Sequence, residues 1–322
     1  MTAARTPWCV GFASNRMTSD VAEFKAGDII EGYRVLSELG RGAASIIYLV
    51  QEPKSKQLWA IKHVEKHTDK DARFLEQAEM ECKIAQQLNH EAIRKITKVI
   101  KKTKNLVQVK ELYLVMEFVD GQSIDIKPPK TLEVAVDVFY QTAMAMAHMH
   151  GKGFVHADMK PNNVVVDNEW KVKLIDLGQS CPINTVKPRI QGTPDFIAPE
   201  QVHRRPITAK TDIYNLGAMM YFVLTKTKVP TALARGDSLM GSLDDAFVEK
   251  PKPVHEVNKN IPMKLSELVM QCVEIDADKR PADMRTVADR LNLIHGILRA
   301  EITKRSNGSS KNGFNATDSS AD

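Results

Sequence analysis

The sequence predicts an α+β protein of two lobes, a small β-rich lobe followed by a larger, mainly helical lobe. From Tyr33 to about Val119, short apolar runs separated by turn residues show the pattern of strands. One segment, about Asp71 to Leu88, interrupts them with helical periodicity. After Asp120-Gly121 the pattern becomes mainly helical. This change of period predicts the two lobes.

The two ends of the chain lack such patterns. Residues 1–27 show no clear periodicity, and we expect a loosely held N-terminal extension there. The folded domain is expected over 28–300, divided into lobes at 28–119 and 120–300. The last residues are mostly Ser, Asn, Gly and Asp, which bury too little apolar surface to offset chain entropy. We therefore expect a disordered polar tail over 301–322.

Composition and charge limit the classes of function. The 322 residues are 43% hydrophobic and 26% charged, as in an ordinary globular protein. A net charge of +5 suits a protein that handles anions but is too small to indicate nucleic acid. No apolar run approaches the roughly 18 residues needed to cross a bilayer. We expect neither a nucleic-acid partner nor a membrane span, and the oligomeric state stays open.

The cysteine pattern argues against a metal or disulfide framework. The four cysteines are far apart, with no C-x-x-C pair, so a reducing compartment fits. The N-terminus has no hydrophobic signal segment, and we expect a cytoplasmic protein. The cysteines are Cys9, Cys82, Cys181 and Cys272.

The densest basic stretch runs from Arg94 to Lys110. We interpret it as the solvated edge of a hairpin, with a docking patch as the less favoured alternative.

A glycine-containing turn, Gly40 to Ser45, lies between two predicted strands, Tyr33–Leu39 and Ile46–Val50. A bare G-x-G is weak, since about one such match is expected by chance at this glycine content. The turn is either a plain hairpin or a loop whose backbone N–H groups can approach phosphates. Its context must decide.

Lys62 provides that context. In the strand Leu58–Val64 a period of two places Lys62 on an apolar face, where a lysine needs an anion to offset its desolvation. Glu81 lies in the inward stripe of the following helix, with Phe74, Ala78, Ala85 and Leu88. The sequence therefore predicts an ion pair, functional or purely structural.

The most specific signal is the run from His156 to Asn163, HADMKPNN, which follows a long amphipathic helix over Thr131–His150. A hairpin comes next, and its second strand delivers Asp176. Asp158, Asn163 and Asp176 can thus meet at one rim, where hard oxygen ligands beside a phosphate suit Mg²⁺.

These motifs, in order over about Tyr33 to Leu298, resemble the eukaryotic-type (Hanks-type) protein kinases. The resemblance implies the two-lobed protein kinase fold, a protein substrate bearing Ser or Thr, and the cofactors ATP and Mg²⁺, with Mn²⁺ as an alternative metal. Ala198-Pro199-Glu200 resembles the end of the family's activation segment, and Thr193 falls where the family stabilises the substrate-docking loop. Asp212 and Arg280 match buried polar positions of the large lobe, with Arg280 pairing with Glu200.

The resemblance also assigns roles to the site residues. Asp158 resembles the catalytic base and Lys160 the lysine at the γ-phosphate. Lys62 resembles the lysine at the α- and β-phosphates, with Glu81 as its helix partner. The implied magnesium ligands are Asn163 and Asp176. The implied nucleotide-binding residues are Gly40, Arg41, Gly42, Ala43, Ala44, Ser45, Ile47, Ala60, Lys62, Met116 (at the gatekeeper position), Glu117, Phe118, Val119 and Val165.

Lys160 resembles the serine/threonine branch of the family, and two motifs, Ala-Pro-Glu-Gln and Asp-Ile-Tyr, look like its bacterial members. Ser45 replaces the third loop glycine, and Ala157 replaces the arginine that normally precedes the catalytic aspartate. Because alanine cannot hold a phosphate, we expect the segment Asp176–Glu200 to be ordered without phosphorylation, unless Arg189 or Lys187 supplies a substitute cation.

Two other functions remain as alternatives. A pseudokinase scaffold would keep the fold and lack the reaction, but it usually lacks an equivalent of Lys62, Asp158, Asn163 or Asp176, and all four are present. A small-molecule phosphotransferase of related fold would lack the segment that docks a polypeptide. The sequence therefore favours a serine/threonine protein kinase.

Overall fold

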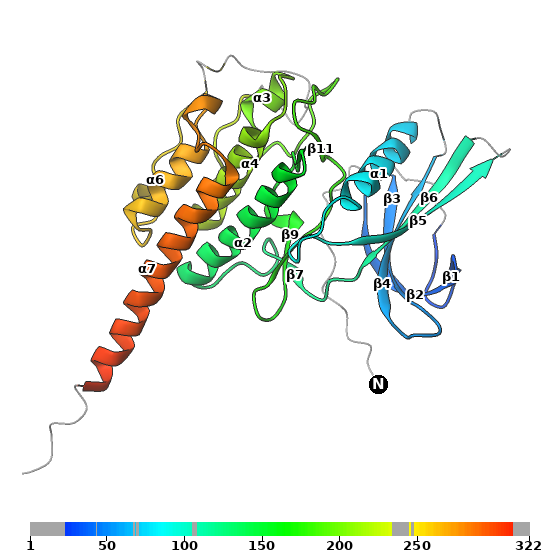
Figure 1. The fold of residues 1–322 in the computed structure, drawn as a ribbon, viewed down its shortest axis with the longest axis horizontal. Helices are drawn as coiled ribbons and strands as arrows, with labels where there is room; N and C mark the ends of the chain where they lie inside the picture. Colours follow the sequence, from blue (N-terminus) through cyan, green and yellow to red (C-terminus); the bar gives the residue numbers. More distant parts are fainter. Residues whose placement is uncertain are drawn as a thin grey trace, which may run out of the picture.

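The computed structural model describes residues 23–42, 44–66, 68, 71–104, 108–233, 245 and 248–311. The β-rich lobe is an antiparallel six-stranded sheet in the order β1-β2-β3-β4-β6-β5 (Figure 1). Its strands agree with the predicted runs, but β2 continues through the first glycine of the turn. Their bounds are β1 Ile29–Ile30, β2 Tyr33–Arg41, β3 Ser45–Gln51, β4 Leu58–Glu65, β5 Ile96–Lys104 and β6 Gln108–Glu117.

The helix of this lobe, α1 (Ala72–Ala85), lies against one face of the sheet (Figure 1). It is shorter than predicted at both ends. Glu81, Ala78 and Ala85 are buried as the periodicity indicates, whereas Phe74 is only partly buried and its neighbour Leu75 is buried instead. The helix therefore presents Glu81 to the sheet as expected.

The C-terminal lobe packs long helices around a nearly fully buried one, α4 (Figure 1). α2 has Thr131 as its N-cap, where the hydroxyl accepts the Val134 N–H. Met146 and Met149 are fully buried and Met144 packs against the core, so their predicted role as core residues is confirmed. The helices are α2 Leu132–Gly151, α3 Pro199–Val202, α4 Ala209–Thr225, α5 Val254–Val257, α6 Met263–Cys272 and α7 Met284–Lys311.

Several short strands and turns complete the C-terminal lobe. β7, β9 and β10 make a three-stranded sheet, and β8 pairs with β11. The HADMKPNN run ends in a single 3-10 turn, η2, which leads directly into β9, and another such turn, η4, precedes α7. Their bounds are β7 Gln122–Ser123, β8 Phe154–Val155, η2 Pro161–Asn163, β9 Val164–Val166, β10 Val172–Leu174, β11 Cys181–Pro182 and η4 Ala277–Lys279.

The two ends of the domain differ from the predicted bounds. Phe24 packs edge-on against Tyr48, so the packed chain begins before residue 28. α7 continues to Lys311 and projects beyond the lobe, which corrects the expected start of the disordered tail at residue 301. Once a helix is anchored, as α7 is by Leu291 and Ile294, each further residue extends it at little cost. Residues 1–22 and 312–322 lie outside the described part of the chain.

The basic run does form a hairpin at the edge of the sheet, with β5 as the edge strand. Several of its lysines are exposed and pair with nearby carboxylates, such as Lys101 with Glu79 and Lys102 with Glu31, each at 2.8 Å. Arg94 departs from this pattern and faces the interior, as described below.

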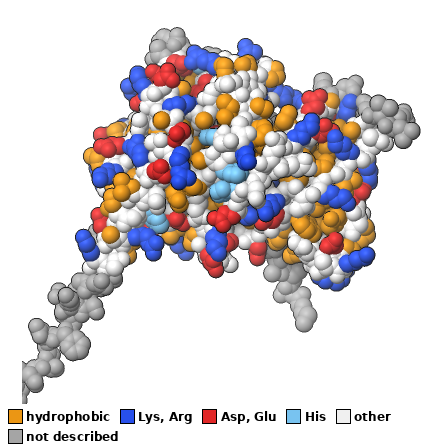
Figure 2. Space-filling view, in the orientation of Figure 1, with side chains coloured by type: hydrophobic (Ala, Val, Ile, Leu, Met, Phe, Trp, Pro, Cys, Tyr) orange, Lys and Arg blue, Asp and Glu red, His pale blue; other side chains and the backbone are white. Residues whose placement is uncertain are grey.

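Charges of both signs are mixed on the face of the molecule shown in Figure 2, over both lobes. Within the described residues, no helix has the length and apolar character needed to cross a membrane.

Candidate active site

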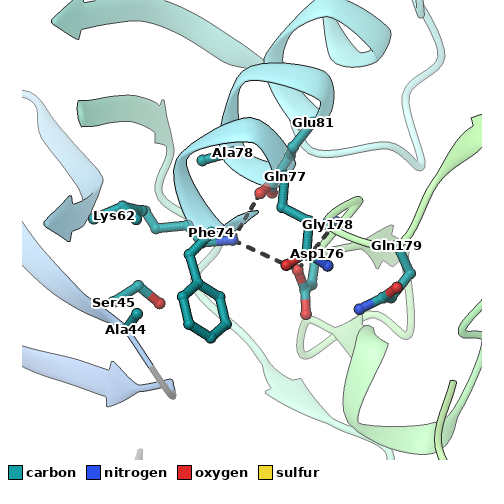
Figure 3. Close-up of a pocket in the computed structure, with 11 residues that line it drawn as sticks. Ala44, Ser45, Lys62, Phe74, Gln77, Ala78, Glu81, Asp176, Gly178 and Gln179 are labelled. Atoms are coloured by element: carbon teal, nitrogen blue, oxygen red, sulfur yellow. Dashed lines mark hydrogen bonds and ion pairs between the residues drawn. The ribbon is translucent and has the colours of Figure 1, made fainter. Parts of the chain in front are cut away.

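Lys62 and Glu81 form the predicted ion pair. β4 lies between β3 and β6, and Lys62 Nζ donates to Glu81 Oε2 at 2.6 Å (Figure 3). Asp176 Oδ1 lies 3.7 Å from the same nitrogen. Burial opposes the charge of Lys62, but Glu81 and Asp176 outweigh it and raise the lysine pKa above its ordinary value. The ammonium is thus held charged between two carboxylates.

Gly178 sits close to this cluster. A Cβ atom at Gly178 would lie 3.1 Å from Asp176 Oδ1. Any side chain there would crowd the carboxylate, so the glycine after Asp176-Leu177 leaves room for the cluster. Leu177 itself is buried, and the lobe accommodates it as an apolar residue.

A cavity of 210 Å³ lies beside the ion pair, between the two lobes. Its walls come from the glycine turn, the ends of β4 and β6, and the η2–β9 segment. Most of the predicted nucleotide-binding residues line it, together with the predicted γ-phosphate lysine and magnesium ligands. These are Gly40, Arg41, Gly42, Ser45, Ile47, Ala60, Lys62, Glu117, Phe118, Val119, Lys160, Asn163, Val165 and Asp176.

Two of the predicted nucleotide-binding residues that the structure describes, Met116 and Ala44, do not line this cavity. Met116 is fully buried, and on β6 it lies directly opposite Ala60 of β4. Ala44 instead lines a second cavity of 150 Å³ between the glycine turn, α1 and Gln179 (Figure 3). Ala43 lies outside the described residues.

Six lining residues were not predicted. Apolar side chains such as Leu39 carry no chemical signature, so only the fold could reveal them. Arg94 lies in the basic run that the sequence assigned to solvent, so its place in the cavity was missed as well. The unpredicted lining residues are Leu39, Arg94, Ser123, Ile126, Asn162 and Ile175.

Asp158 and Lys160 meet at Thr193. Lys160 Nζ donates to Asp158 Oδ2 and to the Thr193 hydroxyl, both at 2.8 Å. The Thr193 backbone N–H and hydroxyl both donate to Asp158 Oδ1, also at 2.8 Å. A residue 35 positions away thereby fixes the orientation of the Asp158 carboxylate.

The backbone before Asp158 is held by hydrogen bonds to Asp212. Ala157 has a φ of 61°, in the left-handed region that non-glycine residues rarely adopt. Asp212, at the start of α4, accepts the N–H groups of His156 and Ala157, each at 2.8 Å. Burial opposes ionisation of Asp212, but the hydrogen bond from His150 and the other donors keep its pKa below the ordinary value. An ionised, buried carboxylate thus fixes the loop.

Asn163 and Asp176 face the same cavity. Asn163 Nδ2 donates to the Asp158 carbonyl at 2.8 Å, which leaves the Asn163 amide oxygen as an acceptor. Desolvation opposes ionisation of Asp176, but the charges of Lys62, Lys160 and Arg94 lower its pKa to about 2. Asp176 also has a positive φ, 64°. The described residues contain no cluster of three or more His, Cys, Asp or Glu side chains able to hold a metal. Mg²⁺ commonly uses one or two protein oxygens completed by phosphate and water, so this pair fits it.

The structure describes every residue of the segment Asp176–Glu200. β11 pairs with β8 through Cys181 and Val155, and Thr185 bridges to Ile207. Beneath it, an apolar cluster forms around Ala157, where the family normally has arginine: Val155, Ala157, Cys181 and Ile207, with Ile183 against them.

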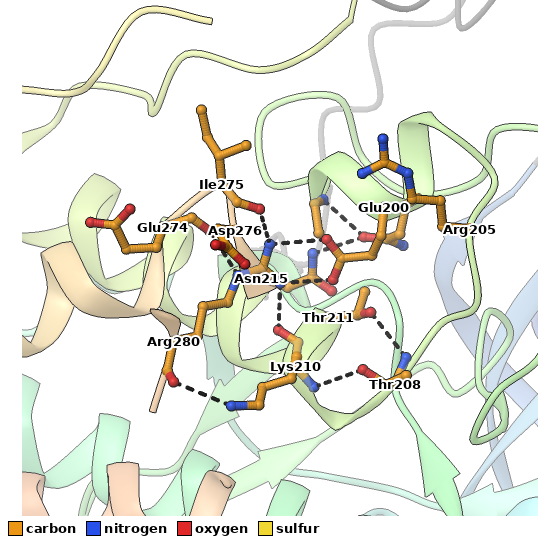
Figure 4. Close-up of polar contacts among 12 residues, drawn as sticks. Glu200, Arg205, Thr208, Lys210, Thr211, Asn215, Glu274, Ile275, Asp276 and Arg280 are labelled. Atoms are coloured by element: carbon orange, nitrogen blue, oxygen red, sulfur yellow. Dashed lines mark hydrogen bonds and ion pairs between the residues drawn. The ribbon is translucent and has the colours of Figure 1, made fainter. Parts of the chain in front are cut away.

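The end of the segment is anchored by a second ion pair. Arg280 donates to both carboxylate oxygens of Glu200, at 2.7 and 3.0 Å (Figure 4). Its remaining donors go to the carbonyls of Glu274, Ile275 and Lys210. The predicted pairing of Arg280 with Glu200 is confirmed.

Comparisons with known proteins agree with this geometry. The chain is 27% identical over 84% of its length to serine/threonine-protein kinase pkn2 of Myxococcus xanthus, covering 34% of that protein. It is 26% identical over 81% of its length to serine/threonine-protein kinase PrkC of Bacillus subtilis, covering 41%. With cAMP-dependent protein kinase type 3 of Saccharomyces cerevisiae it shares 24% identity over 61% of its length, covering 48%.

The chain therefore spans less than half the length of these relatives. The model of the protein kinase domain matches residues 33–291, most of the chain. The chain belongs to the protein kinase family.

Proposed function

We propose that this chain is a serine/threonine protein kinase that transfers the γ-phosphate of Mg-ATP to Ser or Thr hydroxyls of protein substrates. The observation that supports it best is the Asp158–Lys160–Thr193 network at the mouth of the cavity. A residue of the activation segment there contacts the predicted base and the predicted γ-phosphate lysine together. Such an arrangement couples the seating of a polypeptide to the orientation of the reacting groups.

Each residue has a defined part in the proposed reaction. Lys62, held by Glu81, donates to the α- and β-phosphates, and Lys160 neutralises charge on the transferred phosphoryl group. Asp158 orients the substrate hydroxyl and accepts its proton. Glu117, Phe118 and Val119, at the end of β6, provide the wall for adenine.

The magnesium ion is proposed to bind to Asn163 and Asp176. When bound, it would neutralise phosphate charge. Asp176 stays ionised at neutral pH, since its pKa is about 2. Mn²⁺ has the same preference for oxygen ligands and is a second candidate metal.

The buried state of the cysteines supports a reducing compartment. Cys82, Cys181 and Cys272 are free and buried, which supports the proposal of a cytoplasmic location. A pseudokinase scaffold remains the alternative function, but no observation favours it, because Lys62, Asn163 and Asp176 all line the cavity.

The test is incubation with labelled Mg-ATP, alone and with a generic basic protein, followed by phosphoresidue analysis. We expect phosphoserine and phosphothreonine. Asp158→Asn, purified in parallel, controls for a contaminating kinase. Binding of Mg-ATP without any transfer would favour the scaffold, and transfer only to a small molecule would contradict the protein substrate.

A further inference from the structure

Arg94 is a cation inside the nucleotide cavity that the predicted site does not use. Of the described basic residues from Arg94 to Lys110, only Arg94 lines the cavity. It shares that wall with Lys62, Glu117, Ile175 and Asp176.

The backbone of Arg94 is fixed in place. Its N–H donates to the Leu174 carbonyl at 3.0 Å, and Ile93 bridges to Leu174 as a parallel strand residue. Two residues further along the same strand direction lies Asp176. The chain that delivers the predicted magnesium ligand therefore also positions Arg94.

The guanidinium is surrounded by charges but paired with none of them. Burial lowers the pKa of Arg94, and Glu81, Asp176 and Glu117 partly offset that loss. Nevertheless Glu81 is bound by Lys62 at 2.6 Å, and Glu117 by Lys173 at 2.7 Å. Within the part of the chain that the structure describes, the Arg94 side chain has no hydrogen bond or ion pair.

Arg94 is partly buried, and its guanidinium has no protein partner to offset the water contacts that it gives up. Arginine carries five N–H donors in a planar fork that matches two oxygens of one phosphate. Arg94 lines the same cavity as Lys62 and Asp176, the predicted phosphate-binding lysine and magnesium ligand. Its unpaired donors thus belong to the cavity that is proposed to hold the nucleotide.

We propose that Arg94 is a nucleotide-positioning residue, a second cation that works beside Lys62 and donates to the phosphates of the bound nucleotide. This inference rests on the proposed function. It adds to that function a residue that makes the affinity for nucleotides depend strongly on their phosphate chain.

The test compares ligands that differ in their phosphates. The dissociation constants of ATP, ADP and adenosine are measured with Mg²⁺ for the wild type, Arg94→Val and Arg94→Lys. A hydrogen bond to a charged group contributes about 1.5–3 kcal/mol, so Arg94→Val should weaken ATP by about 10- to 100-fold. Adenosine should change by less than about twofold, and Arg94→Lys should lose less ATP affinity than Arg94→Val.

Lys98→Ala is the matched control, since Lys98 is an exposed basic residue of the same hairpin. It should leave all three constants unchanged. An equal loss for adenosine and ATP in Arg94→Val would place Arg94 at the base or in the shape of the cavity, and would overturn the proposal. Unchanged ATP affinity would overturn it as well.

The two proposals fail separately. If the wild type binds no nucleotide at millimolar concentration, the proposed function fails. If the wild type binds ATP and transfers phosphate while Arg94→Val behaves identically, only the role of Arg94 fails.

Discussion

Two ion pairs, Lys62–Glu81 in the β-rich lobe and Arg280–Glu200 in the helical lobe, have similar chemistry in different surroundings. The Arg280 side chain is 0% exposed, and all its nitrogen atoms donate to the protein. Lys62 is 15% exposed and makes one hydrogen bond, although an ammonium has three donors. The Arg280–Glu200 pair is complete without a ligand, and the Lys62–Glu81 pair is not.

The number of donors left without a protein partner separates a structural charge from a functional one. Arg280 fills its donors with one carboxylate and three carbonyls, so little is left for chemistry. Lys62 has donors to spare and faces a cavity. Substitutions on the cavity side should therefore remove activity and keep the fold, whereas substitutions at Arg280 should mainly lower the stability of the fold.

The largest expected effect is at Asp158, on the cavity side. Asp158→Asn should lower phosphotransfer by about 10²–10⁴-fold, because the amide cannot accept the proton and the orienting role is weakened. Initial rates with an outside substrate measure it, and circular dichroism confirms the fold. Asp289→Asn, on the exposed side of α7, is the control. Near-full activity of Asp158→Asn would remove Asp158 from its proposed role.

The second prediction concerns the complete pair. Arg280→Met leaves Glu200 buried and unpaired, and should lower the free energy of unfolding by about 3–5 kcal/mol. Urea unfolding without nucleotide measures it. The adjacent Lys279→Met removes an exposed charge 3.6 Å from Asp276 and should change stability by less than about 1 kcal/mol. Equal effects of the two variants would mean that the buried Arg280–Glu200 pair stabilises the fold no more than an exposed ion pair does.

The third prediction tests the cavity beside the Lys62–Glu81 pair by adding Mg-ATP. Mg-ATP at about 100 times its dissociation constant should stabilise the protein by about 2.7 kcal/mol, measured as a rise in melting temperature. Asp176→Asn should abolish the part of that rise that is lost with EDTA. No rise at millimolar Mg-ATP would favour the scaffold.

The pH dependence of that rise follows from Asp176. Its pKa of about 2 is below the ordinary 3.8, so its stabilising contribution is complete above about pH 4 and disappears as the pH falls toward 2. The magnesium-dependent rise should therefore be unchanged between pH 8 and pH 5, apart from titration of ATP itself.

The smallest expected effect concerns phosphate on the activation segment. Ala157 offers no donor and packs in an apolar cluster, so phosphatase treatment should lower the initial rate by less than tenfold. Mass spectrometry confirms phosphate removal. A larger fall, restored by preincubation with ATP, would show that a substitute cation such as Lys187 or Arg189 holds a phosphate.

The residues that could be predicted from sequence are those whose chemistry is unusual for their place. A lysine on an apolar strand face predicted Lys62–Glu81, and clustered polar residues predicted the rim of Asp158, Asn163 and Asp176. Leu39 and Ile126 could not be found, because an apolar side chain looks the same in a core and in a cavity wall. The resemblance assigned Met116 to the gatekeeper position, and the structure shows its side chain fully buried opposite Ala60.

Arg94 shows that the location of a charged side chain can be equally hard to predict from sequence. Its place in a basic run suggested solvent, and only the tertiary pairing with Leu174 turns it inward. The length of α7 was also missed, since composition near residue 301 reports local preference and not the anchoring of earlier turns.

The left-handed backbone at Ala157 and Asp176 has a consequence for how the site is maintained. Each such residue costs roughly 1–2 kcal/mol of conformational energy. At Ala157, folding of the helical lobe supplies that energy through the hydrogen bonds from the His156 and Ala157 N–H groups to Asp212. The orientation of the Asp158 carboxylate is thus fixed before any substrate binds. The reorganisation that the reaction in solution would need at each turnover is completed once, during folding.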